Sequence, residues 1–448
     1  MSHRYLPHTP RDVARMLDTI GVSDVDALLE PVPAAMRKRA RLDLPAGLDE
    51  HSLREHLTQL ASEVSIPPAE AMFLGGGAYN HFQPSVVDFV ISRSEFYTSY
   101  TPYQPEISQG TLQAIFEYQT LICQLTELEV SNASLYDGAS GLAEALLMAR
   151  RLKRRPRMLL ARSLHPDYRA VARTYLSGGD AKIEEIPFTE AGTVDLGRLE
   201  QMLDGGVAAV ALQSPNFFGC VEDVAAIADM AHKAGALLIS ACTEPISLGV
   251  LRGPGAFGAD IALGDGQSFG LAPSYGGPGF GYFATRNAFV RQIPGRLVGQ
   301  TRDTNGRRGY VLTLATREQH IRRDRATSNI CTNQSLCALA GAAYLATLGK
   351  KGLAGVARMN LDKSEYAKKT ILETAGATLP FSAPTFNEFV VNVRDDPDRV
   401  LSHLRDEGVL GGIALGTWYP ELENAILICV TEMNTRPMIE RLARGLKA

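Results

Sequence analysis

The sequence has 448 residues, of which 45% are hydrophobic and 21% carry a charge, and its formal net charge is −4. These values are typical of a globular protein large enough for more than one domain. A small negative net charge gives no general attraction for nucleic acid or for an anionic membrane surface, so we expect neither as a partner. No apolar run approaches the roughly 20 residues that span a bilayer, and the amino terminus lacks the apolar core of a signal peptide. We therefore expect a cytoplasmic protein.

The first part of the chain, to about residue 75, is predicted to form short helices separated by proline-containing turns. Such short elements do not make an independent core, so we predict an N-terminal helical arm over residues 1–85. A longer helix is predicted over residues 109–129, where apolar side chains recur at helical spacing.

Short apolar stretches then alternate with amphipathic ones. The predicted strands are Arg157–Ala161, Lys182–Phe188, Val207–Ser214, Ala236–Ala241, Ala259–Leu263 and Phe280–Ala284. Helices are predicted between several of them, including residues 196–203 and 223–234. Strands that alternate with helices favour an α/β fold with a mostly parallel sheet covered on both faces. We predict this large domain over residues 86–328.

Beyond about residue 330 the pattern changes. Helices are predicted at residues 333–348, 352–374, near 399–407 and from Pro437, with strands at 388–393 and 425–431. This α+β pattern predicts a smaller C-terminal domain over residues 329–448.

The six cysteines form no CxxC pair and no cluster with histidine. They are Cys123, Cys220, Cys242, Cys331, Cys337 and Cys429. Scattered cysteines, most of them in apolar surroundings, indicate buried reduced thiols rather than disulfides or a zinc site. His81, His165 and His320 lack paired ligand spacing, so we predict no metal site.

Four segments hold more glycine, aromatic or polar residues than packing requires. The first is Glu95–Gly110 (EFYTSYTPYQPEISQG), where three tyrosines lie among prolines. Taken alone, it is best interpreted as an extended aromatic linker. The second is Tyr136–Leu147 (YDGASGLAEALL), a Gly/Ser turn that begins a helix. Its free N–H groups suit a phosphate, but an ordinary N-cap explains the pattern about equally well.

The third segment, Ala259–Gly281, leads from a strand into a glycine-rich loop, which favours a site, or the remnant of one, over a plain connection. The fourth, Thr316–Thr332, contains four arginines partly balanced by acidic residues, and we interpret it as a solvated or interface helix. Thr327, Ser328 and Asn329 near its end could donate hydrogen bonds to an anion. We identify no Walker loop and no nucleophile elbow.

Together these segments resemble the P-protein of the glycine cleavage system, the pyridoxal-phosphate-dependent glycine decarboxylase. The most specific parts are YTPYQPEISQG (Tyr100–Gly110), SLYDGASGLAEA (Ser134–Ala145) and REQHIRRDRATSNICT (Arg317–Thr332). The resemblance covers essentially the whole chain and is greatest to the amino-terminal half of the fused enzyme, which many bacteria encode as a separate subunit 1. It implies the aminotransferase-like pyridoxal-phosphate fold of type I. That fold has a large domain with a seven-stranded sheet, a small C-terminal domain and an N-terminal arm.

The sequence departs from a self-sufficient member of this family at two positions. Such an enzyme needs a lysine to hold the cofactor covalently and an acidic residue to keep the pyridinium nitrogen protonated. Between Ile183 and Gly349 the only lysine is Lys233. The resemblance places Gln267 where the lysine is expected and Ala241 roughly where the acid is expected. We therefore predict no catalytic residue in this chain alone.

The resemblance also implies a partner, a subunit 2 that carries the lysine and the pyridoxal phosphate, in an α2β2 heterotetramer. The pair would act as glycine dehydrogenase (decarboxylating), an oxidoreductase that decarboxylates glycine, releases CO₂ and passes the aminomethyl group to the lipoyl arm of the H-protein. Because cofactor sites of this fold lie at a dimer interface, we expect this chain to complete the partner's site. The substrate side would be lined by Tyr97, Tyr100, Thr101, Tyr103, Gln104 and Glu106. The cofactor phosphate would be reached by Thr327, Ser328 and Asn329.

Two other interpretations stay open. A self-sufficient pyridoxal-phosphate enzyme, such as an aminotransferase or a cysteine desulfurase, requires a lysine in or beside the cofactor loop, and the sequence has none there. A non-catalytic subunit that only stabilises its partner or docks the H-protein has no need of the polar segments, although an interface could use them.

Overall fold

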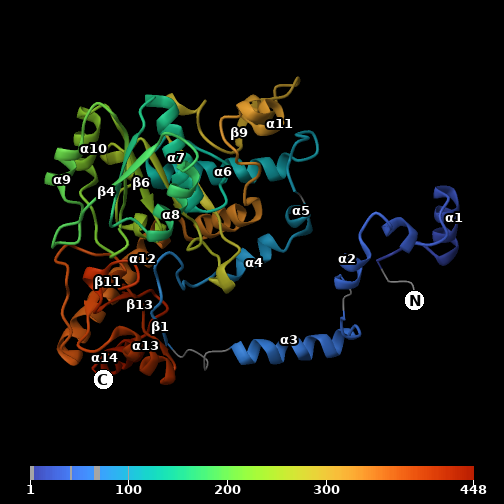
Figure 1. The fold of residues 1–448 in the computed structure, drawn as a ribbon. Coiled ribbons are helices and arrows are strands. Elements are labelled where there is room, and N and C mark those ends of the chain that lie inside the picture. Colours follow the sequence, from blue (N-terminus) through green and yellow to red (C-terminus); the bar gives the residue numbers. More distant parts are fainter. Residues whose placement is uncertain (1–4, 41–42, 65–70, 99, 448) are drawn as a thin grey trace. The chain divides into compact units, whose positions relative to one another are not determined.

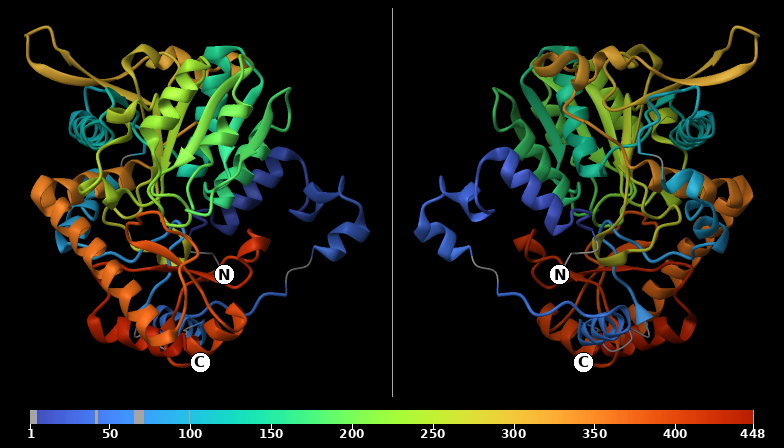
Figure 2. Two further views of the ribbon diagram at one scale, coloured as in Figure 1. Left: turned by 90° about the vertical axis from the view of Figure 1, so that its left-hand side faces the viewer. Right: turned by 90° about the vertical axis from the view of Figure 1, so that its right-hand side faces the viewer.

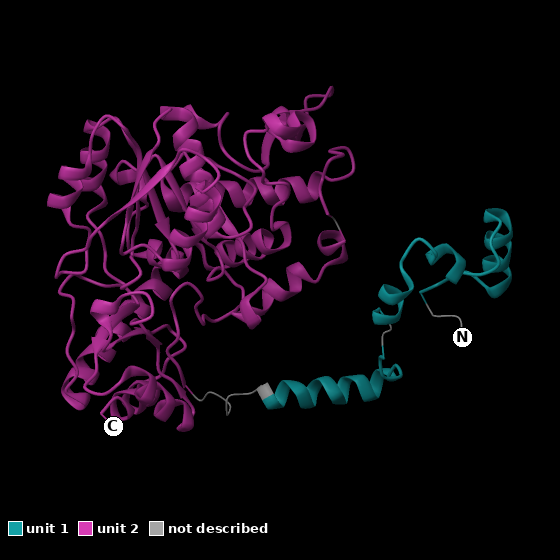
Figure 3. Cartoon of the chain, viewed as in Figure 1, with its two compact units in different colours: residues 1–65 teal, residues 66–448 magenta. Residues whose placement is uncertain are grey.

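The structure is a computed structural model that describes residues 5–40, 43–64, 71–98 and 100–447. The chain forms two compact units, residues 1–65 and residues 66–448 (Figure 3).

The first unit consists of short helices (Figure 1). They are α1 (Pro10–Ile20), the 3₁₀ turn η1 (Asp26–Leu29), α2 (Ala34–Arg39) and α3 (Glu50–Val64). α1 begins with a capping box between Thr9 and Asp12 and ends at Gly21, whose φ of 84° favours glycine. No described residue of this unit is buried. These helices therefore have no hydrophobic core of their own.

A seven-stranded sheet lies at the centre of the second unit, in the order β2-β8-β7-β6-β5-β3-β4. Its strands are β2 (Val130–Ser131), β3 (Arg157–Ala161), β4 (Lys182–Ile186), β5 (Val207–Gln213), β6 (Leu237–Cys242), β7 (Ile261–Asp265) and β8 (Gly281–Thr285). The strands from β3 to β7 pair in parallel, whereas β8 is antiparallel to both β7 and β2. Every residue of β5 is buried, as expected for a central strand covered on both faces. The predicted mostly parallel sheet is confirmed.

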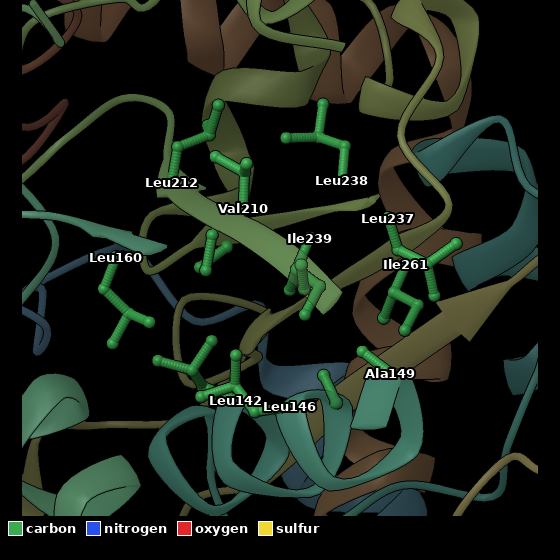
Figure 4. Packing of buried hydrophobic residues seen from close by; sticks show 14 of the residues in the cluster. Leu142, Leu146, Ala149, Leu160, Val210, Leu212, Leu237, Leu238, Ile239 and Ile261 are labelled. Atoms are coloured by element: carbon green, nitrogen blue, oxygen red, sulfur yellow. The ribbon is translucent and has the colours of Figure 1, made fainter. Parts of the chain in front are cut away.

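Helices pack on both faces of this sheet. They are α6 (Gln109–Thr126), α7 (Gly138–Lys153), α8 (Pro166–Leu176), α9 (Leu196–Met202), α10 (Val224–Lys233) and α12 (Ser335–Ala375). Leu146 and Ala149 of α7 belong to the same buried cluster as Val210 and Ile239 of the central strands (Figure 4). The opposite face of β7 contributes Ala262 to a second cluster, which it shares with α6 and α12. Burial of one such aliphatic side chain contributes about 1.5–3 kcal/mol to folding.

The C-terminal part of the second unit is an α+β layer, which α12 reaches after a break at Gly349. Its elements are β11 (Glu388–Asn392), α13 (Pro397–Asp406), β12 (Val409–Leu410), β13 (Ile413–Ala414), β14 (Ala425–Cys429) and α14 (Arg436–Gly445). The strands β11, β14 and β13 form an antiparallel sheet with its own buried cluster around Val391 and Ile428. The α+β pattern predicted for this region is confirmed.

The N-terminal arm is shorter than the predicted residues 1–85. β1 (Ala71–Met72) pairs in parallel with β12, and Phe73 belongs to the buried cluster of the C-terminal layer. The second unit therefore begins at residue 66. A two-residue strand is too short to show a period in the sequence, which explains the difference. The boundary at residues 328 and 329 stays a prediction, because the second unit is not divided further.

Two regions differ from the sequence-based expectation. β9 (Leu297–Arg302) and β10 (Arg308–Thr313) form a hairpin that projects from the rest of the unit (Figure 2) and was not predicted. The Asn305-Gly306 pair in its turn is a hairpin signal. The prediction of a helix near residues 316–332 is wrong. Arg323 has a φ of 53°, and an α-helix cannot continue through a residue with a positive φ. Only short turns form there, η6 (Ala315–Arg317), α11 (Gln319–Arg322) and η7 (Arg323–Arg325).

The remaining elements are short. They are α4 (Ser85–Ile91), α5 (Ser94–Tyr97), η2 (Pro245–Gly249), η3 (Pro254–Phe257), η4 (Ser274–Gly276), η5 (Asn287–Phe289) and η8 (Pro420–Leu422). None of the helices in the described ranges is long and apolar enough to cross a membrane. Over the same ranges, no three side chains of His, Cys, Asp or Glu are grouped to hold a metal ion. The six cysteines are free thiols, and Cys331 is exposed.

Candidate functional site

The carboxyl ends of the parallel strands meet the start of α7 at one edge of the sheet, the usual place for ligands in open α/β folds. Asp265 ends β7, and its Oδ1 accepts a hydrogen bond at 2.9 Å from the N–H of Gly138, the first residue of α7. The Tyr168 hydroxyl donates to the other carboxylate oxygen. Asp137 caps the helix by accepting the Ser140 N–H at 2.7 Å. Two backbone donors at the start of α7 are thus bound by carboxylates of the chain itself.

The space over the start of α7 is filled as well. Tyr168 is 4% exposed, and a Cβ added at Gly138 would overlap its hydroxyl. Burial raises the pKa of Asp265 to about 6, although the hydrogen bonds from Tyr168 and Gly138 oppose the rise. A cofactor phosphate needs these donors and this space, so it does not fit beside Asp265 and Tyr168. In this chain the second segment serves as an ordinary N-cap.

The positions predicted to have lost the lysine and the acid lie at the same edge. Gln267 follows β7 and pairs with the backbone of Tyr79: its Oε1 accepts the N–H at 2.8 Å, and its Nε2 donates to the carbonyl at 3.0 Å. The Nε2 also donates to the carbonyl of Leu271 at 2.5 Å. Ala241 is fully buried in β6. An amide and a methyl group can neither bind an aldehyde covalently nor hold a pyridinium proton.

A glycine-rich segment at residues 75–81 (GGGAYNH) crosses this edge, and sequence reasoning did not single it out. The hydroxyl of buried Tyr79 donates to Glu388 Oε2 at 2.9 Å and lies 3.0 Å from Thr243 Oγ1. The N–H of Gly76 donates to the other oxygen of Glu388 at 2.6 Å. Burial raises the pKa of Glu388 to about 7. The segment connects the sheet edge to β11 through these hydrogen bonds. Its three consecutive glycines are the feature of the sequence that could have pointed to this role.

His81, in the same segment, connects two further loops. One ring nitrogen lies 2.8 Å from Glu244, in the loop after β6, and the other 2.8 Å from Glu432, in the loop after β14. Burial alone would lower the pKa of His81, but the two carboxylates outweigh it and raise the pKa to about 10. The protonated ring therefore holds the two loops together.

Residues 266–270 (GQSFG) match the GxSxG pattern, contrary to the expectation that no nucleophile elbow is present. Ser268 is buried, and its hydroxyl has no hydrogen-bond partner among the residues that the structure describes. A nucleophilic serine needs a base within hydrogen-bond reach. The pattern therefore does not build a nucleophile here.

The tyrosine-rich segment lies at the surface, between α5 and α6. Its exposed side chains are Tyr97, Tyr100, Tyr103, Gln104 and Glu106. Tyr100 is 78% exposed, whereas the hydroxyl of Thr101 is buried and unpaired within the described part of the chain. The hydroxyl of Tyr103 accepts a hydrogen bond from Arg296, which also bonds Cys331 at the end of the fourth segment. The structure thus brings these two predicted segments together.

Thr327, Ser328 and Asn329 line a cavity of about 540 Å³. Glu144 and Arg151 from the middle and end of α7 share this lining. Because a helix rises about 1.5 Å per residue, the cavity lies one or more turns from the start of α7. The three residues therefore line a cavity beside the later turns of α7, not one at its start.

The fold is that of the pyridoxal-phosphate-dependent enzymes of fold type I. The chain superposes on sphingosine-1-phosphate lyase from Burkholderia pseudomallei with a TM-score of 0.67 and 19% identity, over 91% of this chain and 92% of that one. A NifS-like protein matches with a TM-score of 0.64 and 14% identity, over 84% and 98% of the two chains. At these identities the likeness establishes the fold alone.

The chain belongs to the glycine cleavage system P-protein family, whose profile matches residues 3–446. A crystal structure of glycine decarboxylase (P-protein) of the glycine cleavage system, in inhibitor-bound form, is 44% identical and superposes with a TM-score of 0.89 over 99% of both chains. The probable glycine dehydrogenase (decarboxylating) subunit 1 of Desulforamulus reducens is 50% identical, and that of Geotalea uraniireducens is 51% identical, each over 99% of both chains. The family predicted from the sequence is confirmed.

Proposed function

We propose that this chain is subunit 1 of glycine dehydrogenase (decarboxylating) and acts with a second subunit that carries the lysine and the pyridoxal phosphate. Together they would decarboxylate glycine, release CO₂ and pass the aminomethyl group to the lipoyl arm of the H-protein. The observation that carries the proposal is the start of α7, where Asp265 and Tyr168 occupy the place that a cofactor phosphate would need. We infer that a P-protein chain that cannot hold the cofactor contributes instead to a site in another subunit.

The tyrosine-rich segment supports a role on the substrate side of that site. It presents the ring of Tyr100 to solvent, next to the hydroxyl, amide and carboxylate groups of its neighbours. The groups proposed to line the site are Tyr97, Tyr100, Thr101, Tyr103, Gln104 and Glu106. Exposed aromatic side chains mixed with polar ones are typical of interfaces that exclude water from a buried centre.

Thr327, Ser328 and Asn329 support a role on the phosphate side. Their hydroxyl and amide groups can donate hydrogen bonds to an anion, and Arg151 in the same cavity lining adds positive charge. Bound in the partner, the cofactor supplies the electron sink for decarboxylation. The residues of this chain would bind and orient the substrate and the cofactor phosphate, and they would exclude water from the site.

The assembly we propose is an α2β2 heterotetramer in the cytoplasm, with the H-protein as a further partner. The designation of its relatives as subunit 1 supports a second subunit. The net charge of −4 supports neither nucleic acid nor an anionic membrane as a partner.

The purified chain, alone and combined with the lysine-bearing partner, tests this division of roles. We expect the chain alone to show no visible absorption band and no borohydride-reducible adduct after incubation with pyridoxal phosphate. The assembled pair should show the band and catalyse glycine–bicarbonate exchange. A reducible adduct on the isolated chain would contradict the proposal. Full exchange activity from the partner alone would favour a non-catalytic scaffold instead.

A further inference from the structure

Arg296, just before β9, is a buried cation whose side chain is 5% exposed. Its Nη1 donates hydrogen bonds to Thr332 Oγ1 at 3.2 Å and to Asn333 Oδ1 at 3.1 Å. Its Nη2 donates to the carbonyl of Cys331 at 2.7 Å and to the hydroxyl of Tyr103 at 3.2 Å. One guanidinium group thus joins the end of the fourth segment to the tyrosine-rich segment.

The ring of Tyr103 is held by further contacts. The guanidinium of Arg296 lies 5.6 Å from the ring centroid, within the range of a cation–π interaction. The ring of His320 packs edge-on at 6.0 Å, and Glu318 balances the charge 4.0 Å from the Nε of Arg296. More than half of Tyr103 faces solvent. Its ring direction is therefore fixed by these contacts and not by burial.

Asn333 carries the same restraint to the loop before α7. Its Oδ1 accepts from Arg296, which leaves Nδ2 to donate to the carbonyl of Ala133 at 2.9 Å and to the hydroxyl of Ser134 at 3.4 Å. The N–H of Gln334 donates to the same hydroxyl at 3.1 Å. Three segments that are distant in the sequence therefore meet in one network around Arg296.

We propose that Arg296 is a positioning residue, which holds Tyr103 and residues 331–333 in the arrangement that completes the cofactor site of the partner subunit. This inference rests on the proposed function, which gives a role at that site to Tyr103 and to residues 327–329, close in the chain to residues 331–333. A guanidinium group offers five N–H donors in a rigid planar fork, whereas an ammonium group is a point charge on a flexible stem. Arg296→Lys keeps the charge, but its three donors cannot make all four of these hydrogen bonds.

The test compares Arg296→Lys with Arg169→Lys in the assembled two-subunit enzyme. Arg169 is a matched control, because it is 7% exposed, donates to the hydroxyl of Tyr419 at 3.1 Å and lies 5.6 Å from that ring. We expect Arg296→Lys to lower kcat for glycine–bicarbonate exchange by about 10- to 100-fold, the effect of displacing active-site groups by about 1 Å. The KM for glycine and the visible absorbance of the bound cofactor should not change. Arg169→Lys should lower thermal stability and leave kcat unchanged.

Equal losses of kcat in the two variants would overturn the inference, because the loss of any buried arginine would then explain them. The inference also fails if Tyr100→Phe and Thr327→Ala slow the exchange while Arg296→Lys does not, and in that case the proposed function stands. If none of these variants slows the exchange, the proposed lining of the partner's site is wrong and the inference falls with it, although exchange by the pair still supports the proposed function.

Discussion

The carboxylate of Asp265 and the backbone N–H of Gly138 are joined by a 2.9 Å hydrogen bond at the start of α7. The positive end of a helix dipole stabilises such a negative charge, so the chain supplies its own anion at the position that suits a phosphate. The start of α7 is therefore complete without a ligand, and its stability depends on the protonation of a residue of the chain.

Asp265→Asn is predicted to change the pH dependence of stability. The pKa of Asp265 is raised from 3.8 to about 6, so the folded protein binds more protons than the unfolded chain between these values. The contribution of Asp265 to stability therefore falls as the pH rises through that range. At about 1.4 kcal/mol per pKa unit, the change is about 3 kcal/mol. We expect the unfolding free energy of Asp265→Asn, relative to wild type, to rise by up to that amount between about pH 4 and about pH 7.

Urea unfolding at a series of pH values measures this difference. Asp229→Asn, an exposed position on α10, is the control and should follow the wild-type curve. A difference between Asp265→Asn and wild type that does not vary with pH would contradict the prediction.

Gly138→Ala is predicted to destabilise the second unit strongly. The added Cβ would overlap the hydroxyl of Tyr168 and approach the backbone of Gly264 to 2.8 Å, and neither can move without displacing Asp265 or β7. Overpacking of this kind costs about 1–3 kcal/mol, and occasionally more. Gly110→Ala in α6 meets no atom within 4 Å, so its stability should be equal to or above that of the wild type. Equal melting temperatures for the two variants would show that the start of α7 is not filled.

His81→Gln is predicted to cost about 3–5 kcal/mol near neutral pH, because it leaves buried Glu244 and partly buried Glu432 without their cation. The pKa of His81 is raised from 6.5 to about 10, so its contribution is fully present below pH 6.5 and is lost as the pH rises through about 10. The difference between His81→Gln and wild type should shrink over that range in chemical unfolding experiments. His51→Gln, at an exposed position in α3, should behave as wild type throughout. A penalty that stays constant up to alkaline pH would refute the charged state of His81.

Gln267→Lys is predicted not to restore cofactor binding, although it places an amine after β7. Asp265 and Tyr168 still fill the space over α7, and the new side chain loses the paired hydrogen bonds to the backbone of Tyr79. We expect no visible absorption band with pyridoxal phosphate and a loss of about 1–3 kcal/mol in stability. Gln267→Met, which loses the same bonds without gaining an amine, is the control for stability. A cofactor band from Gln267→Lys alone would show that the phosphate space is open.

Tyr100→Phe and Thr327→Ala are predicted to slow the assembled enzyme. Each removes one hydroxyl from a proposed lining of the partner's site, and the loss of about 1–2 kcal/mol slows a rate by about 5- to 30-fold. Glycine–bicarbonate exchange with saturating partner subunit is the measurement. Tyr175→Phe removes the hydroxyl of another exposed tyrosine, on α8, and should have no effect. Unchanged exchange in both variants would remove these residues from the proposed site.

Six of the seven strands of the large sheet could be predicted to within one or two residues at their ends, whereas the two-residue strand β2 was missed. Stretches such as Val207–Gln213 are almost entirely apolar because both faces of the strand are covered. Such a run of apolar residues can be recognised in the sequence. In the hairpin at residues 297–313, the first strand ends in polar, exposed residues. The alternation of apolar and polar residues was therefore weak, and only the Asn-Gly turn indicated a hairpin. The fourth segment was predicted as a helix from its charge pattern, which does not reveal a positive φ at Arg323.

The site was less accessible to prediction than the fold. Motif similarity located the tyrosine-rich segment and the start of α7, but it could not show that Tyr168 bonds Asp265, 97 positions away. The bonds between Gln267 and Tyr79 join residues 188 positions apart, and only the folded topology brings them together. The absence of the lysine was visible in the sequence. The hydrogen bonds that Gln267 and Asp265 make at this edge of the sheet were not.

The pairing of Gln267 with the backbone of Tyr79 makes position 267 part of the hydrogen-bonded framework of this chain. A lysine introduced at position 267 would break that pairing while Asp265 and Tyr168 still filled the space at the start of α7, so we expect this substitution alone not to give an independent enzyme. On the proposed division of roles, this chain would still need its partner subunit after such a substitution.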